Sequence, residues 1–261
     1  MLERKKMKKF LLGAVGLVAL GIAAPASAAD LPARTNYTKA PAIFAPVYDW
    51  SGFYVGLNAG GGWSHNCWDL NSVAGISVVP AVAEGCHSAT GAMAGAQVGY
   101  RWQSANWVFG VEAQGDWASL TGSNQSSPAA LTPVITNQTK VDAIGLFTGQ
   151  IGYAWNNVLW YVKGGAAVTD NKYSGLLTGL GITVDTASGS RWGGAVGTGL
   201  EFGFAPQWSV ALEYDHLFMG RQNANLTLFS MPTRTDSVRQ DVDMATVRVN
   251  YHIGAPVVAK Y

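Results

Sequence analysis

Residues 152–165 read GYAWNNVLWYVKGG, with the pair Asn156-Asn157 near the middle. Apolar and polar or small residues alternate on both sides of this pair, and a period of two predicts a β-hairpin with a short turn. Trp155 and Trp160 flank the turn, while Lys163 lies on the face opposite to the aromatic residues. A strand buried in a soluble core would carry an apolar residue there, so this hairpin indicates a fold whose inner face is the polar one.

The N-terminus has the three parts of a secretory signal peptide. Lysines at positions 5, 6, 8 and 9 precede an apolar run over residues 10–24, and Ala26-Ser27-Ala28 matches a signal-peptidase site. We therefore expect residues 1–28 to be removed on export. Residues 29–49 are rich in proline and alanine without periodicity, which indicates an extended periplasmic linker. No other apolar run approaches the roughly 20 residues that a membrane helix needs.

Composition narrows the class of protein. Charged residues make up 13% of the chain, against about 25% in typical soluble domains. The formal net charge of +1 favours neither nucleic acid nor an acidic partner. Cys67 and Cys86 form an even pair in an exported chain, which predicts a disulfide. A zinc site would need more ligands at closer spacing, so we expect no metal and no cofactor.

Period-two alternation recurs in eight blocks. They are residues 50–63, 89–102, 106–118, 140–155, 158–170, 189–204, 208–220 and 239–253. Short turns at 103–105, 156–157 and 205–207 alternate with long polar connections at 64–88, 119–139, 171–188 and 221–238. This layout is typical of bacterial outer-membrane barrels. We therefore predict an all-β, eight-stranded antiparallel transmembrane up-and-down β-barrel over residues 50–253, with short periplasmic turns, long extracellular loops and a C-terminal extension at 254–261.

The two faces of the predicted strands differ in polarity. A soluble sandwich would bury the polar face and could not tolerate many ionisable groups there. In a membrane barrel the apolar face meets outer-membrane lipids and the polar face lines the interior, where acids and bases can form a hydrogen-bonded network. Ten ionisable residues fall on this inner face: Arg101, Glu112, Asp116, Asp142, Lys163, Arg191, Glu201, Glu213, Asp215 and Arg248.

Eight tryptophans are expected at the two membrane interfaces. Those near the short turns would form one girdle: Trp102, Trp107, Trp155, Trp160 and Trp208. Those near the long loops would form the other: Trp63, Trp117 and Trp192. The tryptophan positions therefore agree with the same two membrane boundaries that the turns and loops indicate.

The histidines of the first long loop are the candidates for ligand binding or catalysis. A disulfide would bring His65 and His87 together as candidate haem ligands, although loop histidines are more often simply solvated. His87, Ser88 and Glu84 contain a base, a nucleophile and an acid. A flexible loop is a poor place for a rigid catalytic constellation, so we expect no catalytic residues and no enzyme.

Two carboxylate pairs on the inner face have a simpler interpretation than acid–base catalysis. Glu112 with Asp116, and Glu213 with Asp215, lie among arginines and a lysine on the predicted inner face. Neighbouring opposite charges favour ion pairs in the lumen over paired catalytic carboxylates. The glycine runs at 60–62 and 193–194 precede no helix, so a phosphate-binding loop is excluded.

Several segments resemble a known family. They are ADLP after residue 28, WSGFYVGLNAGGGW at 50–63, GQIGYAW, RWGGAVGTGLEFG and VRVNY. They resemble the outer-membrane immunogenic proteins of alphaproteobacteria, small porin-type barrels related to the OmpA-type membrane domain. The resemblance implies insertion by the barrel-assembly machinery, antigenic loops, a role in envelope integrity and, in some relatives, haem binding or weak pore activity. Relatives tend to carry arginines in strand four, where this chain has Thr148 and Gln150.

The predicted function follows from the narrow interior of an eight-stranded barrel, which side chains largely fill. We predict a structural outer-membrane protein that supports envelope integrity and presents antigenic loops, with at most weak pore activity. One alternative is a surface protein that binds haem or another small ligand. A lipid-modifying outer-membrane enzyme is a weaker alternative.

Overall fold

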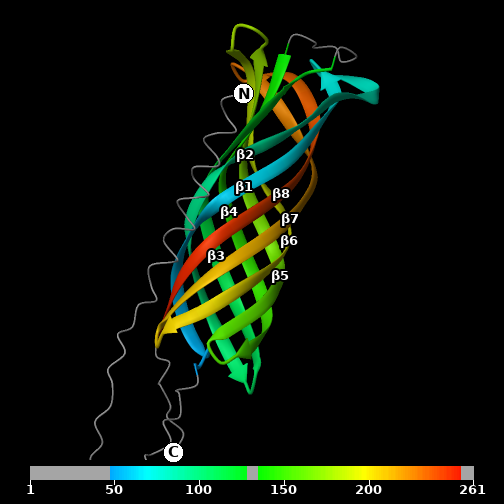
Figure 1. The fold of residues 1–261 in the computed structure, drawn as a ribbon. Coiled ribbons are helices and arrows are strands. Elements are labelled where there is room, and N and C mark those ends of the chain that lie inside the picture. The colour runs from blue at the N-terminus through cyan, green and yellow to red at the C-terminus, as the bar shows by residue number, and fades with distance from the viewer. Residues whose placement is uncertain (1–47, 128–134, 254–261) are drawn as a thin grey trace, which may run out of the picture. The chain divides into compact units, whose positions relative to one another are not determined.

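The computed structural model describes residues 48–127 and 135–253. They form a closed antiparallel barrel in which every strand pairs with its sequence neighbours and the last pairs with the first (Figure 1). The predicted fold class is confirmed. The predicted signal peptide, the linker up to residue 47 and the C-terminal extension lie outside the described residues. Within the described part of the chain, no helix is long and apolar enough to cross a membrane.

Eight strands make the barrel wall. They are β1 (Gly52–Val73), β2 (Ile76–Ser104), β3 (Trp107–Gln125), β4 (Ile135–Trp155), β5 (Val158–Leu177), β6 (Ile182–Ala205), β7 (Trp208–Leu228) and β8 (Met231–Ile253). The Asn156-Asn157 pair is the turn between β4 and β5, and Trp155 pairs with Val158 across it. The short turns gather at one end of the barrel, opposite to the end where the long hairpins protrude (Figure 1).

The long connections differ from the prediction, because most of each one is strand. The connection predicted at 64–88 is a continuous hairpin that turns at Ala74-Gly75. The connection at 221–238 turns at Phe229-Ser230 in the same way. Glycine, serine and threonine are common in these segments and indicate loops, but pairing with a neighbouring strand overrides that local preference.

Two glycines in the wall make room for aromatic rings inside the barrel. Gly99 pairs with Tyr54, and a Cβ atom on Gly99 would lie 2.4 Å from the tyrosine ring. Gly199 has the same relation to Tyr161, again at 2.4 Å. Since a side chain at either position would collide with the ring, both tyrosines depend on a glycine in the adjacent strand.

Candidate functional site

The lumen is the candidate functional site, and its side chains form layers along the barrel axis. Strand β8 illustrates the order, because its buried residues run from Arg248 through Met244 and Val242 to Asp236 and Arg234. A charged layer therefore lies near the short turns, an apolar layer lies in the middle, and a second charged layer lies in the long hairpins.

The lower charged layer centres on Arg248 and Lys163. Arg248 pairs with Glu112 through a 2.5 Å contact and also with Glu213. Lys163 Nζ lies 2.7 Å from Glu213 and 3.2 Å from Asp215. These charges come from β3, β5, β7 and β8 and are buried, so the ion pairs cross the lumen and join opposite walls.

Tyrosines complete this layer. The Tyr54 hydroxyl donates to Glu112 over 2.6 Å, and the Tyr161 hydroxyl donates to Glu213 over 2.6 Å. Hydrogen bonds to ionised carboxylates are short and strong, and they satisfy oxygen lone pairs that a buried ion pair would otherwise leave unpaired. The layer is therefore a cross-linked plug of side chains.

A second ion pair lies nearer to the short turns. Arg101 Nη2 lies 2.8 Å from Glu201 Oε2, and both side chains are fully buried. The Ser209 hydroxyl also donates to Glu201, and the guanidinium of Arg101 stacks over the ring of Tyr54 at 4.4 Å. This pair extends the plug toward the lower mouth of the barrel.

Trp50 closes the lower mouth. Its indole N–H donates to the carbonyl oxygen of Asn156 over 3.0 Å, and its backbone N–H donates to Gln103 over 2.8 Å. The side chain is fully buried and packs against Tyr48 and His252, with ring centroids 4.5 and 5.7 Å away. The segment before β1 thus turns under the barrel and fills its opening.

The middle layer is apolar and spans the lumen. It consists of buried side chains from every strand except β1: Ala89, Met93, Leu120, Val141, Ile144, Leu146, Ala167, Ala195, Leu217, Met219, Val242 and Met244. An ion that crossed it would have to leave its hydration shell without gaining a polar partner, which is very unfavourable. This layer separates the two charged layers.

The upper charged layer is built on Arg234. Its guanidinium lies 2.9 Å from Glu84, 3.1 Å from Asp185 and 3.2 Å from Asp236, and it donates to Asn137 over 2.8 Å. Neither carboxylate oxygen of Asp236 accepts a hydrogen bond from a described residue. Burial, reinforced by Glu84 and Asp185, raises the pKa of Asp236 to about 8. This layer therefore holds more acid than its single arginine can neutralise.

The structure places nine of the ten predicted lumen residues inside the barrel, but not all in one cluster. Asp116 is buried and accepts from Gln114 over 2.9 Å. Arg191 is buried higher up, where it donates to Gln222 and Tyr173. The remaining seven are those of the lower layer described above.

Asp142 is the exception, and its predicted place in the lumen is corrected. A bulge between Val141 and Ala143 shifts the alternation of β4 by one residue, so Val141 points inward in its place. Asp142 lies on the outer surface and pairs with Lys140 and Lys172 at 2.8 and 2.7 Å. One extra residue in a strand moves every side chain after it to the opposite face of the sheet.

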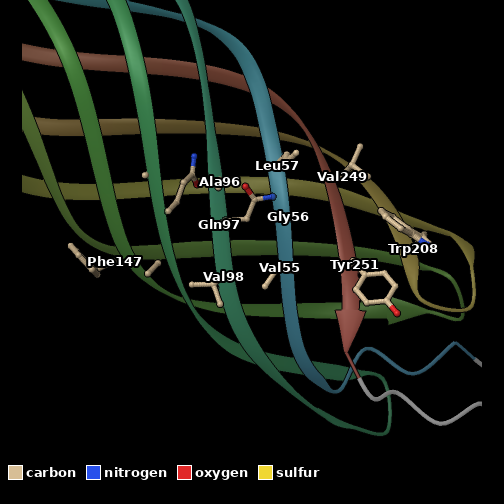
Figure 2. Close-up of a pocket in the computed structure, with 13 residues that line it drawn as sticks. Val55, Gly56, Leu57, Ala96, Gln97, Val98, Phe147, Trp208, Val249 and Tyr251 are labelled. Atoms are coloured by element: carbon tan, nitrogen blue, oxygen red, sulfur yellow. The ribbon is translucent and has the colours of Figure 1, made fainter.

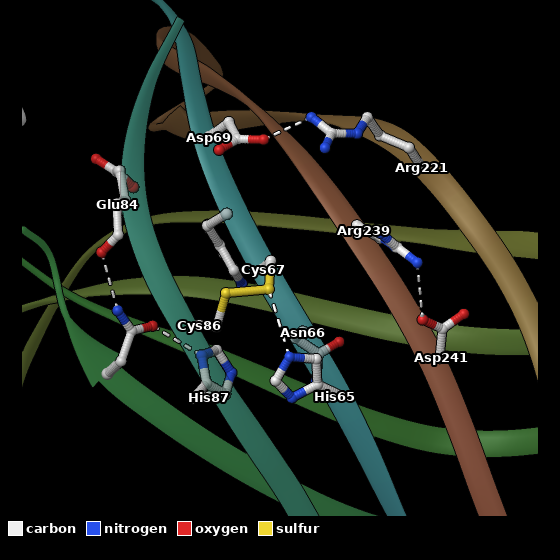
Figure 3. Close-up of a disulfide and its surroundings, with 12 residues drawn as sticks. His65, Asn66, Cys67, Asp69, Glu84, Cys86, His87, Arg221, Arg239 and Asp241 are labelled. Atoms are coloured by element: carbon white, nitrogen blue, oxygen red, sulfur yellow. Dashed lines mark hydrogen bonds and ion pairs between the residues drawn. A yellow bond between two sulfur atoms is a disulfide. The ribbon is translucent and has the colours of Figure 1, made fainter.

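The predicted disulfide is present between Cys67 and Cys86, which are direct partners in β1 and β2 (Figure 3). It does not bring the candidate haem ligands together. His65 is exposed on the outer surface, whereas His87 is buried in the lumen, where it bonds to Asn124 and Thr139 at 2.7 and 3.1 Å. Burial lowers the pKa of His87. The two imidazoles lie on opposite faces of one sheet and cannot share an iron.

The local catalytic cluster is not assembled either. Ser88 is exposed on the outer face, while His87 and Glu84 are buried inside. Glu84 is held by Arg234, Asn137 and Ser126. His87 therefore has neither a serine to activate nor a carboxylate partner among its described bonds.

The upper layer and the closure of the lower mouth are not predicted by the sequence patterns. The residues of the upper layer lie in segments that the sequence predicts as loops, so no inward or outward face was assigned to them. They are Glu84, Asp185, Arg234 and Asp236. One signal was available, because Arg234 and Asp236 continue the inward alternation of β8 upward from Arg248. No sequence pattern pointed to Trp50 as a plug, because its position depends on how the chain enters the first strand.

Comparison with known proteins identifies the family. The family model described as "Outer membrane protein beta-barrel domain" matches residues 14–252. The chain belongs to this family of outer-membrane barrels. It is 28% identical over 232 residues to the 31 kDa outer-membrane immunogenic protein of Brucella melitensis biotype 1, covering 83% of this chain and 89% of that protein. It is 27% identical over 235 residues to the 25 kDa outer-membrane immunogenic protein of Brucella abortus biovar 1, covering 90% and 93%.

Among solved structures, the chain is similar to the outer membrane protein OprG from Pseudomonas aeruginosa, with a TM-score of 0.46 and 9% identity. That match covers 77% of this chain and 97% of that chain. The family assignment places the protein in the outer membrane. The outer face of the barrel is therefore its lipid-facing surface, and the long hairpins form its extracellular head.

The lipid-facing surface of this outer-membrane barrel carries the predicted tryptophans. All eight point outward and are at least 43% exposed. Between the two girdles, small residues such as Ala96 and Gly115 leave a shallow apolar groove bordered by Leu57, Phe147 and Val249 (Figure 2). Lipid chains fill irregularities of this kind, so the groove belongs to the ordinary lipid contact of the barrel.

Proposed function

We propose that this outer-membrane protein is a non-enzymatic closed barrel that supports the envelope and displays its long hairpins at the cell surface. The observation that carries the proposal is the apolar layer that crosses the lumen between the two charged layers. The Trp50 plug below it and the Arg234 layer above it add two further obstructions. Pore activity should therefore be weak or absent.

The remaining alternatives receive less support. His65 and His87 lie on opposite faces of the barrel wall, so they do not form the histidine pair that motivated haem binding. His87 and Ser88 also lie on opposite faces, so the catalytic cluster does not form. One histidine–carboxylate pair does exist on the outer surface, where His216 lies 2.7 Å from Asp243. Asp243 also accepts from Tyr214 over 2.5 Å, an arrangement that fits polar anchoring at the membrane interface.

Planar-bilayer recordings of the refolded protein test the closed lumen. We expect the wild type to show no stable conductance. A variant in which Leu120, Leu217, Met244 and Trp50 are all replaced by alanine shortens three side chains of the apolar layer, removes the lower plug and should show conductance steps. Large, stable conductance of the wild type would overturn the proposal.

A second recording separates the apolar layer from the lower plug. Trp50→Ala removes the indole that fills the lower mouth but leaves the apolar layer in place. We expect this variant to remain closed, because the layer above it still excludes ions. Trp208→Ala, a change on the lipid-facing surface, is the matched tryptophan control.

A further inference from the structure

The tips of three extracellular hairpins expose large apolar side chains to water. We call this set the apolar crown: Ile76 and Val79 after the β1–β2 turn, Leu180 and Ile182 at the β5–β6 turn, and Phe229 and Met231 at the β7–β8 turn. Their exposed fractions range from 58% for Ile182 to 89% for Val79. Several large exposed apolar side chains at one end of a protein indicate an interaction site.

The crown lacks charge. Residues 70–83, 176–184 and 222–233 contain no aspartate, glutamate, lysine or arginine. Natural hairpin tips exposed to water are ordinarily polar, with asparagine, aspartate and glycine at the turn. The three tips thus combine large exposed apolar side chains with an absence of charge.

A charged band separates the crown from the lipid-facing belt below it. On β1, Asp69 follows the girdle residue Trp63 and precedes the tip, and it pairs with Arg221 at 2.5 Å. Figure 3 shows this pair beside the Arg239–Asp241 pair, both on the outer surface. The crown is therefore a second apolar zone, distinct from the surface that contacts the membrane holding the barrel.

The Arg234 layer holds the three tips together. Arg234 on β8 contacts Glu84 on β2 and Asp185 on β6, so one guanidinium links all three hairpins. Thr233 donates to Asp185 over 3.1 Å, and its carbonyl oxygen accepts from the Ala74 backbone N–H over 2.8 Å. A surface that is ordered before binding loses less conformational entropy when it binds.

The β7–β8 turn shows that an aromatic residue is placed at the tip against local preference. Phe229 and Ser230 both have positive φ, of 48° and 67°. Two-residue turns of this type favour asparagine and glycine, and a bulky side chain in the left-handed region is unfavourable. A strained residue that is kept in place suggests a functional reason for it. Here the strain puts a phenylalanine at the outermost point of its hairpin.

We propose that the apolar crown inserts into the interfacial layer of a neutral phospholipid bilayer that faces the bacterial surface. Exposed phenylalanine, leucine and isoleucine are the side chains that enter such an interface. The backbone next to the turn is paired across the hairpin, as at Leu228 with Met231, which satisfies part of the N–H and C=O groups that would enter the interface. Within the tips no residue is charged, so a neutral lipid surface matches them without leaving an ionised group unpaired.

Vesicle flotation tests the proposal. The mature protein, reconstituted in nanodiscs, should float with protein-free phosphatidylcholine vesicles. The triple variant Val79→Asp, Leu180→Asp and Phe229→Asp should lower the floated fraction by about tenfold or more, because charge opposes entry into the interface. Aspartate tolerates positive φ better than phenylalanine, so the change at position 229 should not harm folding. The heat-modifiable gel shift of each variant checks the fold.

A matched control carries a new charge outside the crown. Asn223 is exposed on β7 below the tip, and its Oδ1 atom accepts from Asn71. Asn223→Asp keeps an acceptor oxygen at that position and should float like the wild type. If this control loses flotation as strongly as the triple variant, charge alone explains the effect and the proposal is overturned.

Insertion can be measured at one residue. The two native cysteines form a disulfide, so Phe229→Cys offers a single free thiol for an environment-sensitive dye. Vesicles should shift its emission to the blue, and brominated lipids should quench it. An unchanged spectrum would overturn insertion. Binding to a protein that depends on the crown, without vesicle flotation, would also overturn the lipid assignment.

This inference rests on the proposed display role, and the two are tested separately. Conductance does not enter the flotation assay. A conducting wild type that still floats would contradict the closed barrel and leave the crown proposal standing. A closed wild type that fails to float would contradict the crown proposal and leave the closed barrel standing.

Discussion

The two charged layers use the same chemistry in different surroundings. In the lower layer, Arg248 and Lys163 bridge three carboxylates, and two tyrosine hydroxyls add short hydrogen bonds. In the upper layer a single arginine, Arg234, serves Glu84, Asp185 and Asp236. The lower layer lies between the tryptophan girdles and the upper layer lies beyond them. The lower layer therefore stabilises the transmembrane barrel, whereas the upper layer stabilises only the extracellular head.

The most damaging change should be Arg248→Met in the lower layer. It leaves Glu112 and Glu213 buried with Lys163 as their remaining base, and removing one partner of a buried pair costs about 3–5 kcal/mol. We expect a lower urea midpoint in lipid vesicles and loss of the heat-modifiable gel band. Arg239→Met is the control, because its side chain is 63% exposed and the expected change is below about 1 kcal/mol. Equal effects would contradict the assigned role of the lower layer.

Arg234→Met should have a local effect of about 3 kcal/mol, because it leaves three acids without their arginine. Hydrogen exchange should accelerate in the tips of β1–β2, β5–β6 and β7–β8, while the transmembrane strands keep their protection. The gel shift should persist. Global unfolding of this variant would show that the two layers are not independent.

Cys67→Ser should have a smaller effect, confined to the β1–β2 hairpin. The disulfide joins two residues that already pair directly, and the loop that it closes is short, so a loss of about 2 kcal/mol is expected. Limited proteolysis should detect faster cleavage in this hairpin alone. Cleavage of the β5–β6 hairpin at the same rate would mean that the disulfide supports the whole head.

Asp236→Asn should change how the stability of the head depends on pH. The folded carboxyl has a pKa of about 8, above the value of about 3.9 in an unfolded chain. Its contribution to stability is therefore fully present below about pH 4 and is lost as the pH rises to about 8. The stability of the wild-type head should therefore fall as the pH rises through this window. Asp236→Asn should flatten that slope in hydrogen exchange, and an unchanged slope would show that Asp236 is not responsible.

The transmembrane part was predictable because one physical constraint acts on it. Lys163, Glu112 and Arg248 point into the lumen, and the eight tryptophans of the two girdles point outward. Lipid outside and a crowded polar lumen inside enforce that alternation along every strand. A charged residue on the outer face would lie in hydrocarbon, which is very unfavourable, so the pattern is read directly from the sequence.

Prediction failed where that constraint ends. Beyond the upper girdle water surrounds the hairpins, so serine, threonine and glycine are acceptable on both faces and a strand resembles a loop. Asp142 was misplaced because nothing local reveals the bulge after Val141. His65 and His87 were paired by their distance along the chain to the disulfide, whereas the pleat of the sheet puts them on opposite faces.

Lys163 shows which features of the protein follow from the sequence and which require the tertiary structure. Its sequence context was sufficient to place it inside an outer-membrane barrel, because alternation and aromatic girdles follow from the solvent on each side of the wall. Its partners Glu213 and Asp215, the apolar layer above them and the Arg234 layer that gathers three hairpins were decided only by the tertiary structure. Those contacts join residues from strands that are far apart in the chain. Strand register and bulges determine which residues meet, and no local sequence pattern encodes either of them.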